Sequence, residues 1–504
     1  MIRLLQLPDA LVGCCLSNLD TIDRLVARYV CKRWHVLCVA PISWTDGVIS
    51  CDGDEKMFLP PHGPFRNLKP KVLLLPQMRV YDAPLPKHFS RVEHLRARYL
   101  HPALGVREMP KLRILELESA YTVDGLGFSL EQLQQMEELR LGMLRGPVFM
   151  SLLHQMPKLH SLTLTFPKDA DLCSLRGLRL TKLNMKVSDL TDAGLLAISS
   201  ISTLSRLKIA LMGNNTLPDR SWSHLSQLPS LTRLALVSFS LETESALIDI
   251  FKGMTALRRL DMKNLFVRRW EPLFSRVTGL CLTSLSISTG QGSAVSAHQV
   301  LRCFESCPQL NRLRLSHRFG TPVWSLLDKG NVGRLGRVAP NLTALHLSGH
   351  ALTTAAATII VQMYPGLIEL ELTITELPDS ALTMLCSLPL RHLLLANVNP
   401  TSYAILARLA PSLRILRFAY GVRPTCEQLM NEMKLPSMLH LHSLGLFSYF
   451  DPPCWEHITH PTSVHLHCMS RGISLTTRSG SSKLHFIARL AADTRKEDNI
   501  KSIL

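Results

Sequence analysis

From residue 112 onward, one pattern of apolar positions recurs along the chain: Leu-x-x-Leu-x-Leu, with Ile, Met or Phe sometimes at the last position. The last four residues of each copy alternate between apolar and variable positions, which predicts a short β-strand with its leucines on one face. Amphipathic segments such as 191–201, 297–307 and 380–388 lie between copies and predict helices. The copies begin at residues 112, 136, 159, 180, 204, 231, 257, 282, 310, 342, 367, 390, 413 and 441.

The spacing between copies averages about 25 residues, which is within the range of leucine-rich repeats. One copy cannot bury its leucine side alone, so neighbouring copies must stack. Proline precedes many of the predicted strands and ends the preceding helix, as at Pro157, Pro308 and Pro365. The sequence therefore predicts an α/β fold, a leucine-rich-repeat solenoid with a parallel sheet inside and helices outside.

The composition changes on both sides of the repeats. Seven prolines between residues 60 and 86 break any long helix and predict a connector or an irregular entry repeat. After Asp451 the leucine pattern fades into a Ser-rich, charged segment, which predicts a cap and a tail. We expect an N-terminal unit over 1–45, the connector or irregular entry over 46–90, the repeat arc over 91–450, and the cap and tail over 451–504.

Residues 7–38 predict a separate, small α-helical unit. Pro8 and Asp9 are suited to the start of one helix, and the segment from Asp20 to Asp23 is suited to the start of another. Helices this short have little core of their own. They therefore need a partner or the rest of the chain to be stable.

The same residues resemble an F-box. The family pattern opens with Leu-Pro, continues with apolar helix positions and a Leu-Asp or Leu-Pro break, and closes with Val-Cys-Lys-x-Trp. This chain has Leu7-Pro8-Asp9, Leu19-Asp20 and Val30-Cys31-Lys32-Arg33-Trp34 at the family spacing. It departs from the family at Cys14-Cys15, where a bulky pair such as Ile-Phe is usual.

The resemblance implies the substrate receptor of an SCF-type (Skp-cullin-F-box) ubiquitin ligase. F-box proteins bind a Skp-type adaptor, and through it a cullin-RING ligase, and they hold a protein substrate with a second domain. Such a receptor has no active site of its own. The implied adaptor-binding residues are Leu7, Pro8, Leu11, Leu16, Leu19, Leu25, Val30, Cys31 and Trp34.

The variable strand positions predict a target-binding surface on the concave face of the repeats, where repeat proteins usually bind. These positions carry Glu in the first two copies and are mainly basic in copies four to nine. Arg and Lys pair with carboxylate and phosphate, so we expect an acidic or phosphorylated protein substrate. A solvated face of a basic protein is the alternative. The basic candidates are Lys182, Lys186, Arg206, Lys208, Arg233, Arg259, Lys263, Arg312 and Arg314.

The formal net charge of +17 favours an anionic partner, whether an acidic protein or a nucleic acid. The basic positions carry few aromatic residues on which bases could stack, so we expect no nucleic-acid binding. Thirteen cysteines, an odd number without small-domain spacing, predict reduced thiols and a cytoplasmic or nuclear location. Neither a signal-peptide pattern nor an apolar run of bilayer length occurs, so we expect no membrane association.

Motifs for catalysis or cofactor binding are missing from the sequence. A phosphate-binding loop, a His-Glu-x-x-His zinc helix and a Gly-x-Ser-x-Gly elbow do not occur. The His and Cys residues between Cys454 and Cys468 match no zinc spacing. We therefore expect no enzyme activity, no cofactor and no metal. The alternative function is a non-catalytic leucine-rich-repeat scaffold or inhibitor that does not bind the adaptor, which the Cys14-Cys15 pair favours.

Overall fold

The computed structural model divides into two compact units, Met1–Leu257 and Arg258–Leu504. The predicted helical unit of residues 7–38 lies outside the described residues, as do all but the last residue of the predicted helix at 297–307 and most of the tail. The structure describes residues 48–50, 71–80, 90–100, 106, 109–119, 128–142, 152–167, 169–212, 217, 219–238, 250–251, 253–265, 280–289, 307–317, 329–348, 352–373, 377–396, 403–409, 411–419, 443–447 and 474–477.

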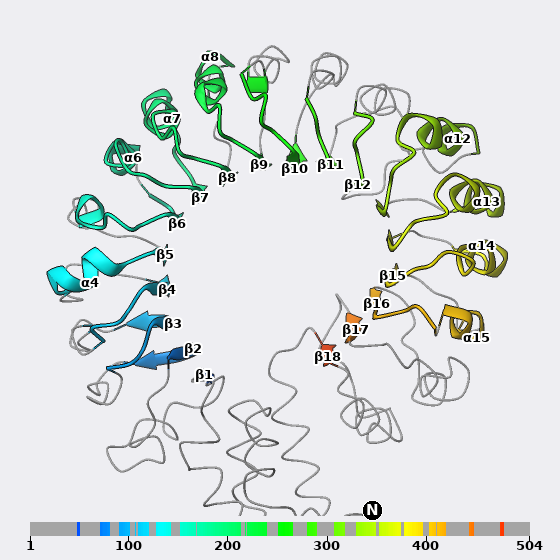
Figure 1. The fold of residues 1–504 in the computed structure, drawn as a ribbon, viewed down its shortest axis with the longest axis horizontal. Coiled ribbons are helices and arrows are strands. Elements are labelled where there is room, and N and C mark those ends of the chain that lie inside the picture. Colours follow the sequence, from blue (N-terminus) through cyan, green and yellow to red (C-terminus); the bar gives the residue numbers. More distant parts are fainter. Residues whose placement is uncertain are drawn as a thin grey trace, which may run out of the picture. The chain divides into compact units, whose positions relative to one another are not determined.

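The first unit contains a parallel sheet in which each strand pairs with the next one along the chain. Figure 1 shows the strands of this unit on its inner side and the helices on its outer side. The described strands are β1 Val48–Ser50, β2 Val72–Val80, β3 His94–Leu100, β4 Ile114–Ser119, β5 Glu138–Leu141, β6 Ser161–Thr165, β7 Lys182–Val187, β8 Arg206–Leu211 and β9 Arg233–Val237. The described helical segments are α4 Leu130–Gln135, η7 Leu153–Gln155, α6 Asp169–Cys173, α7 Asp192–Ser199, α8 Asp219–Trp222 and η8 Ser223–Gln227.

The second unit repeats this arrangement, again with parallel strands that pair in the order of the chain. None of the helices in the described part of the chain has both the length and the apolar character that a membrane span requires. The described strands are β10 Arg259–Leu265, β11 Ser284–Thr289, β12 Arg312–His317, β13 Ala344–Ser348, β14 Glu369–Thr373, β15 His392–Ala396, β16 Ile415–Ala419, β17 Ser443–Phe447 and β18 Ser474–Thr477. The described helical segments are α12 Lys329–Val338, α13 Thr354–Met363, α14 Asp379–Leu385, α15 Tyr403–Leu406 and η11 Ala407–Leu409.

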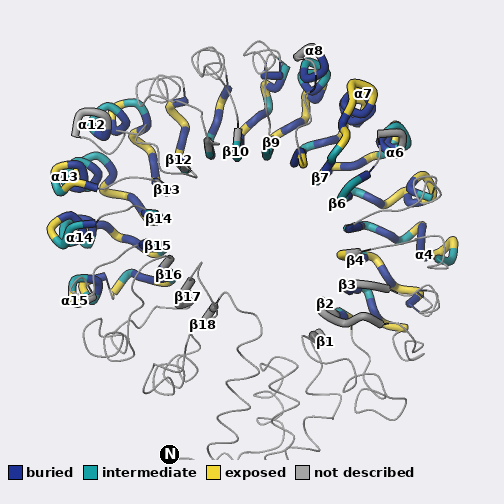
Figure 2. The backbone as a smooth tube through the Cα atoms, turned by 180° about the vertical axis from the view of Figure 1, so that it is seen from behind, coloured by how far each residue is buried: buried dark blue, intermediate teal, exposed yellow. Residues whose placement is uncertain are grey.

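The leucines of the repeated pattern form the core of both units. Leu183, Leu207 and Leu234 occupy one register row on β7, β8 and β9, and each is at most 1% exposed. Figure 2 shows buried residues in strands and helices alike, as expected where the two layers pack together. Strands β4 to β17 correspond to the fourteen predicted copies. α7 falls within the predicted helix at 191–201, and α14 overlaps the predicted helix at 380–388. The leucine-rich-repeat fold is therefore confirmed.

The sheets extend beyond the expected repeat range of 91–450. β1 and β2 lie in the segment expected to be a connector or irregular entry, and β18 lies in the expected cap and tail. β2 contains Pro76, and its register with β3 shifts between Leu75 and Arg79. Proline has no N–H to donate to a neighbouring strand, so it is tolerated where regular pairing is interrupted. The prolines of this segment therefore do not prevent it from joining the sheet.

Candidate binding surface

The variable strand positions lie on the face of each sheet that is turned away from the helices, which we call the open face. Alternate strand residues are buried, and the residues between them form rows across neighbouring strands. All nine basic residues expected to bind the target occupy such positions. The first unit carries Lys182, Lys186, Arg206, Lys208 and Arg233, and the second carries Arg259, Lys263, Arg312 and Arg314.

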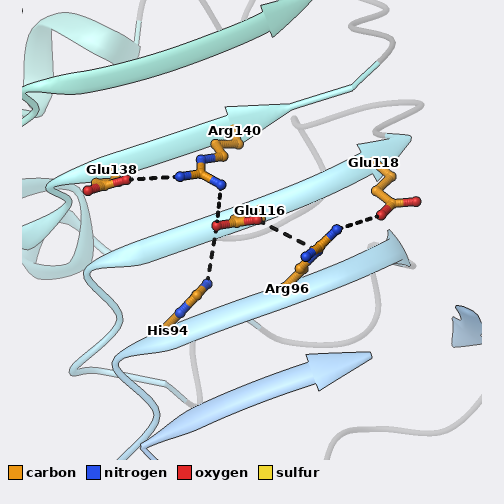
Figure 3. Close-up of polar contacts among 6 residues, drawn as sticks. All are labelled: His94, Arg96, Glu116, Glu118, Glu138 and Arg140. Carbon is orange, nitrogen blue, oxygen red and sulfur yellow. Dashed lines mark hydrogen bonds and ion pairs between the residues drawn. The ribbon is translucent and has the colours of Figure 1, made fainter. Parts of the chain in front are cut away.

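A network of opposite charges covers the open face over β3, β4 and β5 (Figure 3). Its centre is Glu116, whose side chain is only 13% exposed. Arg140 Nη1 lies 2.9 Å from Glu116 Oε1, and Arg96 Nε lies 3.7 Å from Glu116 Oε2. The same guanidinium groups reach Glu138 and Glu118, at 3.6 and 3.3 Å. We call this group, completed by His94, the charge network.

The charge network holds Glu116 in its ionised form. The contact with His94 and the nearby Arg140 and Arg96 lower the pKa of the Glu116 carboxyl group, although its partial burial acts in the opposite direction. His94 Nε2 lies 3.4 Å from Glu116 Oε1. Acidic and basic side chains on this part of the open face therefore balance one another, and little charge is left for a partner.

The open face becomes basic further along the first unit. On β6 the open-face residues are neutral, namely Ser161, Thr163 and Thr165. On β7, β8 and β9 five of the nine open-face positions are Lys or Arg, and none is acidic. We call these five residues, Lys182, Lys186, Arg206, Lys208 and Arg233, the basic rows.

In the second unit, two of the predicted binding residues pair with acids on another strand. Arg312 Nη2 lies 2.6 Å from Glu369 Oε2, across β13. Ala344 stands between them in the same register row, and its small side chain leaves room for the arginine to reach over. In the next open-face row, Arg314 Nη2 lies 3.7 Å from Glu371 Oε2. Arg312 and Arg314 are therefore tied to acids of their own sheet.

His346 lies between these two glutamates and is 7% exposed. Its Nε2 is 3.0 Å from Glu369 Oε1, and its Nδ1 is 2.6 Å from Glu371 Oε2. Both ring nitrogens are buried, and the carboxylate oxygens approach them away from the directions of straight hydrogen bonds. The contact is therefore mainly an electrostatic one.

The two carboxylates change the acid–base behaviour of His346. Burial lowers the pKa of the imidazole, but the nearby Glu369 and Glu371 outweigh burial and raise the pKa above its ordinary value. In return, His346 lowers the pKa of Glu369. Burial raises the pKa of Glu371, but His346 and Arg314 more than compensate, and the net shift is downward.

The imidazole and the two carboxylates are also ligand types for a divalent cation. Their ligand atoms lie within 4.8 Å of one another, in the part of the chain that the structure describes. Arg312 and Arg314 contact the same carboxylates and already balance their negative charge. Two guanidinium groups would therefore compete with any cation at this place.

Comparison with known protein families places a domain at the N-terminus. Residues 4–46 match the F-box domain. The chain carries an F-box domain. All nine residues expected to contact the adaptor fall within this F-box, and they lie outside the described residues. F-box domains bind Skp-type adaptors of cullin-RING ligases, and leucine-rich repeats are binding modules, so both recognisable parts of this F-box protein are of a kind that binds other molecules.

Comparisons with curated proteins and with solved structures add no further family. No relative was found among the curated proteins. Among the solved structures, the F-box protein is similar to one described as the crystal structure of a TLR13-ssRNA13 complex, with 16% sequence identity and a TM-score of 0.40. That match covers 78% of this chain, and the chain spans 62% of the other one. The leucine-rich-repeat fold follows from the strands and their register.

The pairing of Arg312 and Arg314 with acids was not anticipated from the sequence of the F-box protein. Glu369 and Glu371 follow Arg312 and Arg314 by 57 residues, so the charges look separate along the sequence. A usable signal exists, because Arg312 and Glu369 occupy the same position of their copies, and Arg314 and Glu371 share another. Ala344, at the equivalent position of the copy between, permits the longer reach.

Replacing His346 by glutamine tests this cluster, because glutamine keeps polarity but cannot be protonated. Because the pKa of His346 is raised on folding, its contribution to stability is fully present below pH 6.5, the ordinary pKa of histidine. That contribution is lost as the pH rises through the pKa of His346 in the folded protein. Because the pKa values of the glutamates are lowered, their contribution is present above pH 4.5 and is lost as the pH falls through their pKa values in the folded protein. We therefore expect the stability difference between wild type and His346→Gln to be largest between pH 4.5 and pH 6.5 and to shrink at higher pH.

Urea unfolding of both proteins across this pH range measures the difference. Glu371→Gln should show the same maximum, since it removes one partner of the ring. A stability difference that stays constant with pH, or that grows above pH 8, would contradict the assignment of charge to His346.

Proposed function

We propose that this F-box protein is the substrate-recognition subunit of an SCF-type (Skp-cullin-F-box) ubiquitin ligase. The observation that carries the proposal is the F-box at residues 4–46 in one chain with leucine-rich-repeat units whose open strand face is charged. In this function the F-box binds a Skp-type adaptor, and the repeats hold a target protein. The chain is then not an enzyme, because it brings the target close to a ubiquitin-conjugating enzyme that the cullin recruits.

In this proposal, binding of the adaptor by the F-box depends on apolar contacts. Most of the nine F-box residues are apolar, and burial of apolar area contributes roughly 25 cal/mol per Å² before the costs of association. Cys14 and Cys15 are smaller than the Ile-Phe pair that is usual in the family, so they would bury less area. We expect adaptor binding that is weaker than in a family member with the bulky pair.

A cytoplasmic or nuclear location belongs to the same proposal. The cysteines that the structure describes, Cys173, Cys281, Cys307 and Cys386, are all free thiols. Burial raises the pKa of the Cys307 and Cys386 thiols to about 11, which keeps them protonated at neutral pH. Free, protonated thiols are compatible with a reducing compartment such as the cytoplasm or nucleus. The proposed binding to a cullin-RING ligase takes place there.

Affinity capture of the intact chain tests the proposal directly. The intact chain should recover the adaptor and a cullin, and a Leu7→Ala, Pro8→Ala, Trp34→Ala variant should lose both. The reason is that this variant removes the opening and closing residues of the F-box motif. The matched control is Arg206→Glu on the open face of the first unit, which should recover the adaptor as well as the wild type does.

The outcomes separate the two candidate functions. Loss of the adaptor in the F-box variant alone supports the ligase receptor. If neither protein recovers the adaptor, the receptor proposal fails and the non-catalytic scaffold or inhibitor takes its place, as the Cys14-Cys15 pair would favour. Equal recovery by wild type and variant would mean that the contact does not use the F-box residues.

A further inference from the structure

Two carboxylates and an imidazole meet on the open face of the second unit. Glu369 and Glu371 lie two residues apart on β14 and so share one face of the strand, and His346 on β13 pairs in register with Glu371. One ligand atom of each residue lies within 4.8 Å of the other two. We call these three residues the His346 cluster. The backbone hydrogen bonds between β13 and β14 hold them at this spacing.

The ring nitrogens of His346 are buried without a hydrogen bond. The residue is 7% exposed, and neither nitrogen has a hydrogen-bond partner in the described part of the chain. Buried polar atoms are normally satisfied by a hydrogen bond or an ion. Nε2 lies 3.0 Å from Glu369 Oε1, but away from the direction of a straight hydrogen bond. Two ligands of one tetrahedral zinc ion are roughly 3.3 Å apart and do not point straight at each other, so these two atoms are spaced like ligands of a common ion.

The charges around the ring favour a cation at this place. Burial lowers the pKa of His346, but Glu369 and Glu371 outweigh it and raise the pKa, because they stabilise a positive charge at the ring. A divalent cation bound to the neutral ring supplies that positive charge instead of the proton. Metal ligands must be deprotonated. Contact with His346 lowers the pKa of Glu369, and the net shift of Glu371 is also downward despite its burial, so both carboxyl groups are ionised at neutral pH.

Arg312 and Arg314 compete with a cation, but only weakly. Arg312 contacts Oε2 of Glu369, whereas the ring faces Oε1, so Arg312 can stay beside a bound ion and orient the carboxylate. Arg314 contacts the oxygen of Glu371 that faces the ring, at a longer distance of 3.7 Å. Both arginine side chains are about half exposed, and exposed ion pairs contribute little to stability. Arg314 can therefore turn into water when an ion binds.

We propose that the His346 cluster binds a divalent cation of the zinc type, with one ligand atom from each of His346, Glu369 and Glu371. Zinc accepts imidazole nitrogen together with carboxylate oxygen, whereas calcium and magnesium prefer oxygen alone. A second imidazole, that of His392 on β15, stands beside Glu369 in register and adds another nitrogen donor next to the cluster. The bound ion links β13 to β14 through their side chains. This inference does not depend on the F-box or on the proposed ligase function.

Zinc titration of the full chain tests the inference. The protein is first treated with a chelator, and zinc chloride is then titrated in a calorimeter at about pH 8, which favours the neutral imidazole. We expect the wild type to have one zinc site whose affinity falls by about tenfold or more in His346→Gln, because a ligand is lost. Glu371→Gln should weaken the same site. Magnesium chloride in place of zinc chloride should bind much more weakly, because magnesium prefers oxygen ligands.

The matched control is Arg314→Gln, which changes a neighbour of the cluster but removes no ligand. It should bind zinc at least as tightly as the wild type, because it removes a positive charge that competes for Glu371. Thermal unfolding in the presence of chelator should show that all variants are folded. Added zinc should then raise the Tm of the wild type and of Arg314→Gln more than that of His346→Gln. The His and Cys residues between Cys454 and Cys468 are the same in every variant, so zinc bound there does not affect the comparison.

Three results would overturn the inference. Equal zinc affinity and stoichiometry of the wild type and His346→Gln would mean that any zinc binds elsewhere on the chain. An equal loss of binding in Arg314→Gln would indicate a general disturbance of the open face and not the loss of a ligand. Magnesium binding as tight as zinc binding would remove the imidazole from the site. Adaptor capture does not enter these measurements, so the proposed function is tested separately.

Discussion

Replacing Leu207 by alanine should destabilise the first unit by about 2–5 kcal/mol. Leu207 is 1% exposed and lies between Leu183 and Leu234 in one register row of the core. Its removal leaves a cavity that touches the repeats on both sides, and repeat units derive their stability from contacts with their neighbours. We therefore expect a value in the upper half of the range. Urea unfolding followed by circular dichroism measures it.

Arg206→Ala is the control, because Arg206 is the next residue and lies exposed on the open face. Surface substitutions of this kind usually change the free energy of unfolding by less than about 0.5 kcal/mol. The contrast between adjacent residues tests the alternation of the strand directly. If the two substitutions cost the same, the assignment of leucines to the core and of charges to the open face would be wrong.

The strands of this fold are predictable because one short pattern both places and aligns them. The alternation of leucines sets the buried face of each strand. A shift of the strand register by one residue would turn Leu207 and Leu234 to the solvent. The register between strands therefore follows the position within each copy. For this reason the row of Lys182, Arg206 and Arg233 follows from the repeat pattern alone.

The entry to the repeats was harder to predict. The prolines of residues 60–86 indicated a connector or an irregular entry repeat, and they left open whether this segment joins the sheet. β2 does pair with β3 despite Pro76. A proline excludes a regular pairing at its own position, and the shift in register between Leu75 and Arg79 removes that requirement. Sequence alone does not show where a partner strand tolerates such a shift.

The state of the open-face charges also depends on three-dimensional contacts. The sequence indicated acids in the first copies, yet Glu116 is balanced by Arg140 and Arg96 on both neighbouring strands. It indicated a basic surface that includes Arg312, yet Arg312 reaches Glu369 two strands away. The order of charges along the chain does not show which basic residues meet acids, since these contacts form across strands.

Gly142→Ala should have the other large effect on stability, because the backbone approaches closely at this residue. Gly142 directly follows β5, and its N–H donates to the carbonyl oxygen of Leu117, at an N···O distance of 2.6 Å. A Cβ atom on Gly142 would overlap with the carbonyl group of Glu118. That obstacle is backbone and cannot rotate away, so either β4 or β5 must shift.

We expect Gly142→Ala to destabilise the first unit by about 3 kcal/mol or more, since it strains the backbone and weakens a strand contact. The control is Gly333→Ala in α12, where a Cβ atom meets nothing within 4 Å. Alanine there should be neutral or stabilise the helix by about 0.5–1 kcal/mol. Urea unfolding of both variants decides the matter. A cost below about 1 kcal/mol for Gly142→Ala would mean that β4 and β5 lie further apart at this point. The distance between Glu116 on β4 and Arg140 on β5 would then also be longer than 2.9 Å.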